Sequence, residues 1–164
     1  MTGLHTDKRL ILGVDPGLSG AVAVLDGDSV LYLEDLPTVQ FSNARIKNRV
    51  DGASLAAMLA PYADRIRLAV VERVGARPGE AASGAFCFGY TSGVIHGVLG
   101  ALRIPVELPM PVTWKRAMGL GKDKGLSRSR AIELYPSMAP MLSRVKDHDR
   151  AEAILLATYG GRHG

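Results

Sequence analysis

The order of apolar and polar positions predicts three antiparallel strands in the first part of the chain. Residues 10–14, Leu-Ile-Leu-Gly-Val, form an unbroken apolar run. Such a run is typical of a strand that is buried on both faces in the middle of a sheet. Two further strand-like segments follow at 20–25 and 30–33, with Asp-Gly-Asp between them. An Asp-Gly turn between two apolar segments predicts a hairpin.

Further strands and helices are predicted along the rest of the chain. Residues 67–71 form a second buried-strand pattern, and residues 105–108 form a short one. Helical patterns cover the segments 55–59, 83–102, 111–116 and 127–135, and a last helix begins near Asp147. The helix at 55–59 has Asp51 or Ser54 as its candidate N-cap, and Pro61 ends it. Residues 37–51 lack any such pattern, so we expect an exposed basic loop there.

The segment 83–102 combines a helical pattern with several interior glycines. Its apolar residues at helical spacing include Phe86, Tyr90 and Val94. A glycine inside a helix costs about 1 kcal/mol relative to alanine, so several of them indicate close packing. We expect these glycines to pack on the sheet rather than on a ligand backbone, and Phe86, Phe88 and Tyr90 to lie in the core. Stacking of the aromatic rings on nucleic-acid bases is the alternative.

Composition and charge narrow the class of protein. The chain has 164 residues, of which 47% are hydrophobic and 22% charged, so we expect residues 1–164 to form a single globular domain. Its net charge of +4 favours a polyanionic partner. Cys87 is the only cysteine, which excludes an internal disulfide and a cysteine-rich zinc site. No targeting or membrane-spanning pattern is found, so we expect a cytoplasmic protein without a membrane partner.

Two of the predicted buried strands end in a carboxylate. Asp15 follows the first run, and Glu72 follows the strand at 67–71. A carboxylate is costly to bury unless a metal ion, another cation or hydrogen-bond donors accompany it. The alternative for Asp15 is that it caps the Pro16-Gly17 turn, a position that aspartate favours.

The last helix carries a third set of candidate ligands. His148 and Glu152 are four positions apart, and Asp149 and Glu152 are three apart. At these spacings all three side chains can leave one face of a helix. The alternative is that the acidic residues only complement the helix dipole at the N-terminus.

Together these residues predict a divalent metal site. Carboxylate oxygens with one imidazole suit Mg²⁺ or Mn²⁺ better than structural zinc. Clustered carboxylates repel one another unless a cation neutralises them. Two such ions can activate a water molecule and stabilise the leaving oxygen in phosphodiester hydrolysis.

Two basic segments are candidates for contact with a phosphate backbone. Their residues are Arg45, Lys47 and Arg49 in the first segment and Lys122, Lys124 and Arg128 in the second. The alternative is that both are ordinary solvated loops. Basic segments around an acidic centre are what a nuclease needs, because its substrate is a polyanion.

Four motifs resemble the RuvC-like Holliday junction resolvases of the RNase H superfamily, in the family's order and at about its spacing. They are Val-Asp-Pro-Gly-Leu-Ser-Gly at 14–20, Val-Val-Glu at 70–72, Trp-Lys at 114–115, and Lys-Asp-His-Asp-Arg-Ala-Glu-Ala at 146–153. Residues 15–21, the Phe-Gly-Tyr at 88–90 and the last motif most resemble the branch that contains the plant organellar resolvase and its bacterial and phage relatives.

The resemblance implies a fold and an activity. The fold is α/β and RNase H-like, a five-stranded mixed sheet with three antiparallel strands and then two parallel ones, flanked by helices. The activity is that of a Mg²⁺-dependent endodeoxyribonuclease, in which Mn²⁺ can substitute. The active form is a homodimer that cuts two opposed strands of a four-way DNA junction.

The resemblance also implies roles for single residues. Asp15 and Glu72 match the first two acidic ligands, and Glu152 matches the last. His148 matches the imidazole of the organellar branch. Bacterial RuvC more usually has two aspartates three apart, so Asp149 is the alternative to His148 as the third ligand.

Two lysines are also matched by this resemblance. Lys115 resembles the lysine that the family places near the scissile phosphate, and Lys124 is a candidate for a second one.

Three other classes of protein share parts of this pattern. Actin-like ATPases and sugar kinases also begin with a strand and an Asp-x-Gly, but they need a second nucleotide-binding lobe for which 164 residues leave no room. A non-catalytic RNase H-like DNA-binding module would have the same basic loops without a metal ion, so metal titration separates it from a nuclease. An RNase H-like nuclease that acts on another branched or hybrid substrate shares the chemistry.

Overall fold

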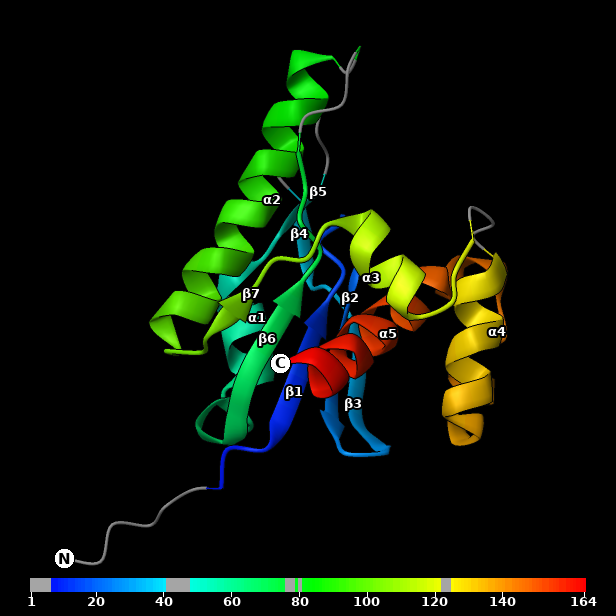
Figure 1. The fold of residues 1–164 in the computed structure, drawn as a ribbon. Helices are drawn as coiled ribbons and strands as arrows, with labels where there is room; N and C mark the ends of the chain where they lie inside the picture. Colours follow the sequence, from blue (N-terminus) through cyan, green and yellow to red (C-terminus); the bar gives the residue numbers. More distant parts are fainter. Residues whose placement is uncertain (1–6, 41–47, 76–78, 80, 122–124) are drawn as a thin grey trace, which may run out of the picture.

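Five strands form one mixed sheet in the computed structural model of the protein (Figure 1). The structure describes residues 7–40, 48–75, 79, 81–121 and 125–164. Across the sheet the strands follow the order β3 (Ser29–Asp35), β2 (Ala21–Asp26), β1 (Leu10–Val14), β6 (Ile66–Val71) and β7 (Val106–Glu107). Strands β1, β2 and β3 are antiparallel, whereas β6 runs parallel to β1 and β7 runs parallel to β6. The predicted mixed sheet is therefore confirmed.

The central strand β1 is buried because helices cover both faces of the sheet. Leu12 of β1 packs in a core with α1 (Gly52–Leu59) and α2 (Ala82–Ala101), whereas Ile11 packs in a second core with α5 (His148–His163). Figure 1 shows α5 in front of the sheet and α1 behind it. Each strand position thus faces one of two cores, which explains the unbroken apolar run in the sequence.

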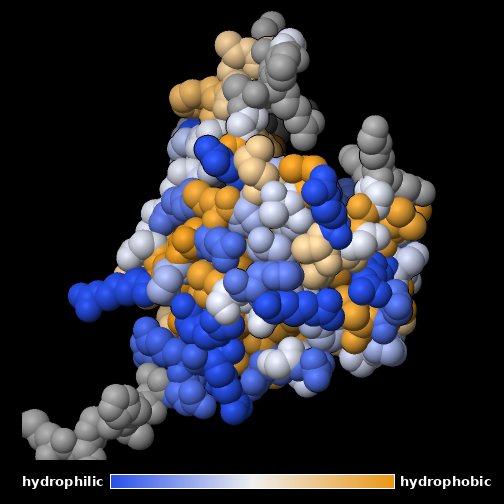
Figure 2. Space-filling model, in the orientation of Figure 1, coloured by the Kyte–Doolittle hydropathy of each residue, from blue (hydrophilic) through white to orange (hydrophobic). Residues whose placement is uncertain are grey.

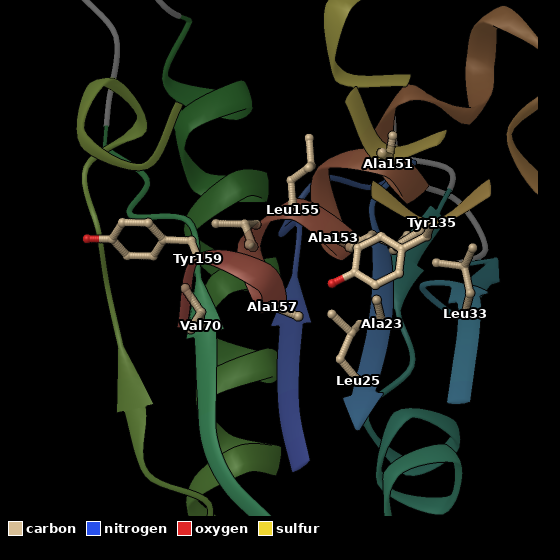
Figure 3. Close-up of a cluster of buried hydrophobic side chains, with 14 of the residues drawn as sticks. Ala23, Leu25, Leu33, Val70, Tyr135, Ala151, Ala153, Leu155, Ala157 and Tyr159 are labelled. Atoms are coloured by element: carbon tan, nitrogen blue, oxygen red, sulfur yellow. The ribbon is translucent and has the colours of Figure 1, made fainter. Parts of the chain in front are cut away.

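The core under α5 brings this helix unusually close to β1. Figure 3 shows Ala153 and Ala157 of α5 near the side chains of Ala23 and Leu25 from β2. A Cβ atom on Gly13 of β1 would collide with the backbone of Ala153 and Ala157. Glycine is required here because the helix backbone occupies the space of a side chain. This contact holds the helix against the centre of the sheet.

The predicted start of α1 is confirmed. The Asp51 carboxylate accepts hydrogen bonds from the Ala53 N–H at 3.1 Å and from the Ser54 hydroxyl at 2.5 Å. Asp51 is therefore the N-cap, which satisfies a backbone donor that the first helical turn leaves open. The helix ends at Leu59, two residues before Pro61.

The prediction of a loop over residues 37–51 is wrong for the two ends of this segment. Strands β4 (Thr38–Gln40) and β5 (Asn48–Val50) pair with each other as a separate antiparallel ribbon. Each strand is three residues long, which is too short to show an alternating pattern in the sequence.

The position of α2 agrees with the prediction, but its packing does not. The helix buries Thr91, Ile95 and Leu99, whereas Phe86 is 65% exposed and Tyr90 is 39% exposed. A Cβ atom would meet no other part of the described structure at four of the glycines, namely Gly89, Gly93, Gly97 and Gly100. The expectation that the glycines and aromatic rings pack on the sheet is wrong. The helix is apolar on two faces, and a periodic pattern does not tell which face meets the sheet.

Five further helical segments complete the described part of the fold. They are η1 (Ala63–Arg65), α3 (Pro111–Ala117), α4 (Gly125–Leu134), η2 (Pro136–Leu142) and η3 (Val145–Asp147). Pro111 opens α3, a position where its fixed φ angle is favourable. Within the described ranges, no helix has the length and apolar character needed to cross a bilayer.

Candidate active site

The two strand-end carboxylates lie at the same edge of the sheet. Asp15 follows β1, Glu72 follows β6, and these two strands are parallel neighbours. The Glu72 N–H points to the Val14 carbonyl oxygen at 3.4 Å, so the pairing continues to the end of both strands. Parallel strands end on the same side, which is why two distant carboxylates meet.

A tight turn holds the backbone of Asp15. Its N–H donates to the Ala21 carbonyl at 3.0 Å, and the Gly20 N–H donates to the Gly17 carbonyl at 3.0 Å. A Cβ atom on Gly20 would collide with the Asp15 carbonyl oxygen. Only glycine permits the chain to return this closely beneath Asp15.

Helix α5 brings further acidic side chains to the same place. Asp149 lies close enough to Asp15 for its charge and a side-chain hydrogen bond to raise the pKa of Asp15. Glu152 is buried and accepts a hydrogen bond from the Ser127 hydroxyl of α4 at 3.0 Å. The close approach of α5 at Gly13 positions its first two turns beside the end of β1.

Four carboxylates, Asp15, Glu72, Asp149 and Glu152, therefore form one acidic cluster. Burial raises the pKa of Asp15 well above its ordinary value, and the negative charges of Asp149, Glu152 and Glu72 raise it further in that order. Each added negative charge in a partly buried site disfavours ionisation of its neighbours. The pKa of Asp15 thus records the convergence of all four side chains.

His148 lies next to this cluster. Its Nε2 atom is 2.7 Å from Asp149 Oδ1, and its Nδ1 atom is 3.3 Å from the Val145 carbonyl oxygen. Asp149 contacts both His148 and Asp15, so it stands between the imidazole and the strand end. Both candidates for the third ligand are brought to the site, with Asp149 in direct contact with Asp15.

Lys115 of α3 enters the cluster from the other side. Its Nζ atom is 3.3 Å from Glu152 Oε1 and 3.9 Å from Glu72 Oε1. It also lies 5.1 Å from the centroid of the Trp114 ring. The Trp114 indole N–H donates to Glu72 Oε1 at 3.1 Å. The Trp-Lys pair of the sequence thus contacts the acidic cluster with both side chains.

The chemistry of the acidic cluster fits a divalent cation. All four members present carboxylate oxygens, the ligands that Mg²⁺ and Mn²⁺ prefer, and their mutual repulsion favours a bound cation. Among the described residues, no three histidine, cysteine, aspartate or glutamate side chains are already arranged to hold one ion. The donors suit the metal, and their side chains must move to gather around it.

Two residues that hold these carboxylates were not among the predicted site residues. Trp114 is fully buried, and Ser127 is 3% exposed. Trp114 is part of the Trp-Lys motif, which is a weak signal for a site. Ser127 has no sequence signal, because its contact with Glu152 spans 25 positions along the chain.

The predicted DNA-binding residues fall into two groups. Arg45, Lys47, Lys122 and Lys124 lie outside the residues that the structure describes. Arg49 is described, and its guanidinium lies 4.7 Å from the centroid of the Tyr90 ring.

Arg128 makes contacts within the protein. Its side chain donates to the Leu142 carbonyl at 2.9 Å and to the Ser143 carbonyl at 3.0 Å. The guanidinium therefore ties α4 to the end of η2.

Comparisons with known proteins agree with this architecture. No protein-family profile matches the chain. Over 114 residues the chain is 32% identical to "Holliday junction resolvase MOC1, chloroplastic" from Chlamydomonas reinhardtii, a match that covers 65% of this chain. The chain spans 13% of the length of that relative.

Solved structures of RuvC have the same fold. One is "T. thermophilus RuvC in complex with Holliday junction substrate", with a TM-score of 0.61, 17% identity, and coverage of 94% of this chain and 96% of that one. A second is "Thermus thermophilus RuvC structure", with a TM-score of 0.51, 14% identity, and coverage of 93% and 95%. The predicted RNase H-like fold is thereby confirmed.

Proposed function

We propose that this chain, whose resemblance to the RuvC-like Holliday junction resolvases is confirmed in sequence and in fold, is an endonuclease that resolves four-way DNA junctions. The observation that carries the proposal is the acidic cluster at the ends of two parallel strands, with Lys115 beside it. Residues 1–164 act as one nuclease domain. The products are paired, symmetric incisions in two opposed strands.

We assign a divalent cation, Mg²⁺ with Mn²⁺ as a substitute, to the acidic cluster. Asp15, Glu72 and Glu152 are the ligands carried over from the sequence. Asp149 completes the set, because it contacts Asp15 directly, and His148 orients Asp149 from behind. When bound, divalent cations activate the attacking water and neutralise charge on the leaving oxygen.

The other side chains prepare the site for a phosphodiester. Trp114 and Ser127 each donate a hydrogen bond to one carboxylate, so Glu72 and Glu152 are held before the substrate arrives. Lys115 brings a positive charge that can approach a phosphate oxygen. Preorganised charges of this kind stabilise the transition state without reorganisation during the reaction.

The active form is a homodimer, because a junction with two-fold symmetry is cut at two related positions. The outward face of α2, with Phe86 and the four open glycines, is the proposed interface. Figure 2 shows apolar residues at the surface near the upper end of α2. Glycines without neighbouring atoms let a second helix approach closely. Sedimentation that detects only monomer at micromolar concentration, with and without DNA, would contradict this interface.

Cleavage of a substrate panel tests the proposed activity. We expect Mg²⁺-dependent, paired incisions in a four-way junction and little cleavage of flap, duplex or RNA–DNA hybrid substrates. Asp15→Asn should abolish cleavage while junction binding is kept or tightened, since the change removes one metal ligand and one negative charge. Mg²⁺-dependent cleavage by Asp15→Asn would contradict the assignment of the site.

The same panel separates the alternative functions. A non-catalytic DNA-binding module binds the junction equally well with and without Mg²⁺ and leaves every substrate intact. A nuclease for another substrate cleaves the hybrid or the flap in preference to the junction.

A further inference from the structure

Lys115 lies between two carboxylates that are proposed to bind metal. Its ammonium group is within ion-pair distance of Glu152 at 3.3 Å and of Glu72 at 3.9 Å. The Lys115 side chain is 33% exposed, so its charge is only partly screened by solvent. The aromatic ring of Trp114, 5.1 Å away, adds a further favourable contact for the cation.

The lysine and the neighbouring donors meet the same oxygen atoms. Glu72 Oε1 receives the Trp114 N–H and faces Lys115 Nζ. Glu152 Oε1 receives the Ser127 hydroxyl and faces the same Nζ atom. An ammonium group and a divalent cation cannot both lie close to this pair of carboxylates without repelling each other strongly.

One ammonium group does not neutralise the acidic cluster. Burial and three neighbouring carboxylates hold the pKa of Asp15 well above its ordinary value, although an ammonium group lies 3.3 Å from one of them. The ammonium group of Lys115 lies on the Glu72 and Glu152 side of the cluster, at 3.9 and 3.3 Å from the two carboxylates. The four carboxylates carry more negative charge than the single charge of Lys115 offsets, so the cluster still attracts a cation of higher charge.

We infer that Lys115 and a divalent cation compete for Glu72 and Glu152, and that the cation displaces the ammonium group when it binds. This inference rests on the proposed function, because it takes the acidic cluster to be the metal site. Until displacement, Lys115 reduces the repulsion between the two carboxylates. Afterwards the ammonium group of Lys115 lies free beside the site, where it can donate a hydrogen bond to a substrate phosphate.

Calorimetric titration with Mn²⁺ tests the competition in the absence of DNA. Lys115→Met keeps the apolar stem beside Trp114 and removes the charge. We expect it to bind Mn²⁺ at least about tenfold more tightly than the wild-type chain, since an opposed charge within a few Å is removed. Arg116→Met is the matched control, because it removes the same charge from the next position of α3, on an exposed side chain. It should change the affinity by less than about twofold, because exposed charges are screened.

Thermal unfolding gives a second measurement that does not depend on activity. Without divalent cations, Lys115→Met should unfold at a lower temperature than the wild type, because the ammonium charge opposite Glu72 and Glu152 is removed. Saturating Mn²⁺ should raise its unfolding temperature by more than it raises that of the wild type, since tighter binding to the folded state stabilises it more. Lys115→Gln, which also removes the charge, should repeat both results.

The outcomes separate this inference from the proposed function. Equal or weaker Mn²⁺ binding by both Lys115 variants, with clear binding by the wild type, overturns the competition and leaves the metal site intact. Absence of Mn²⁺ binding by the wild type and by all variants overturns the proposed metal site itself.

Discussion

At the scale of single residues, two aspartates near the site have pKa values that are shifted in opposite directions by their surroundings. Asp15 lies among like charges, which raise its pKa, whereas Asp147 accepts hydrogen bonds from the Arg144 guanidinium, which lower its pKa. The Arg144 and Asp147 side chains meet at 2.8 Å. The ionised form is therefore disfavoured at Asp15 and favoured at Asp147.

These two aspartates predict opposite dependences of stability on pH. In the folded state Asp15 holds its proton to higher pH than in the unfolded state, so its contribution to stability falls as pH rises from the ordinary aspartate pKa through the raised value. Without divalent cations, Asp15→Asn should therefore raise the unfolding temperature at neutral pH, and the gain should shrink at acidic pH. Thermal denaturation across this pH range measures the effect.

Asp147→Asn is the control, because it should change the unfolding temperature in the opposite direction. In the wild type, the lowered pKa of Asp147 stabilises the folded state at pH values above the ordinary aspartate pKa. This stabilisation is lost as the pH falls through the pKa that Asp147 has in the folded state. The variant should unfold at a lower temperature than the wild type at neutral pH. A rise in unfolding temperature for Asp147→Asn, or a fall for Asp15→Asn, contradicts the electrostatic account.

His148 and Asp149 are distinguished by single-turnover cleavage with Mg²⁺. Asp149→Ala should abolish cleavage, because it removes the carboxylate that contacts Asp15. His148→Ala should lower the rate by about 10- to 100-fold, the usual effect of removing a residue that orients a metal ligand. The reverse order of the two effects would assign the imidazole as the ligand instead.

At the scale of elements, the site depends on how closely α5 approaches β1. Gly13 has no space for a side chain, because the backbone of Ala153 and Ala157 lies against it. Near its start, the same helix presents Asp149 and Glu152 to the strand ends. The contact between Gly13 and helix α5 therefore sets both the packing of the core and the geometry of the site.

Gly13→Ala should both destabilise the protein and lower the affinity of the acidic cluster for Mn²⁺. The added methyl group forces α5 away from the sheet, and overpacking of this kind costs about 1–3 kcal/mol. Denaturant unfolding and Mn²⁺ titration measure the two effects. Gly161→Ala is the matched control on the same helix, since a Cβ atom there meets nothing. It should be neutral or stabilise by up to about 1 kcal/mol. Equal effects of the two substitutions would refute this role of the contact.

Arg128 is expected to act on the packing of α4 more than on DNA. Arg128→Ala removes the donors for the Leu142 and Ser143 carbonyls, so it should lower the free energy of unfolding by about 1–3 kcal/mol. The salt dependence of junction binding should stay as in the wild type. A flatter salt dependence with unchanged stability would return Arg128 to the DNA-binding residues.

At the scale of the whole molecule, an acidic centre is combined with a net charge of +4. An acidic centre repels phosphate unless cations occupy it, so the proposed binding of DNA requires basic residues elsewhere on the chain. Binding of this kind releases counterions from the DNA, which makes it steeply dependent on salt.

Junction affinity should therefore fall steeply and linearly in a plot of log K against log salt concentration. Lys122→Ala/Lys124→Ala should flatten the slope by about two units, one for each phosphate that is no longer neutralised. Fluorescence anisotropy with a labelled junction, in Ca²⁺ to prevent cleavage, measures the slope. An unchanged slope in the double variant would remove both lysines from the interface.

Much of the site was accessible from local patterns in the sequence. Apolar runs that end in Asp15 and Glu72, and an acidic turn at the start of the last helix, were identified because strand and helix periodicity depend on neighbouring positions. The N-cap at Asp51 and the hairpin at residues 26–28 were predicted for the same reason. These features need no knowledge of distant parts of the chain.

The tertiary structure decided which distant residues meet. Trp114 reaches Glu72 across 42 positions, and Ser127 reaches Glu152 across 25, so no local pattern reports either contact. The same limit applies to α2, whose two apolar faces look alike in the sequence, although only one meets the sheet. Burial of a face depends on what packs against it, and that is a property of the folded chain as a whole.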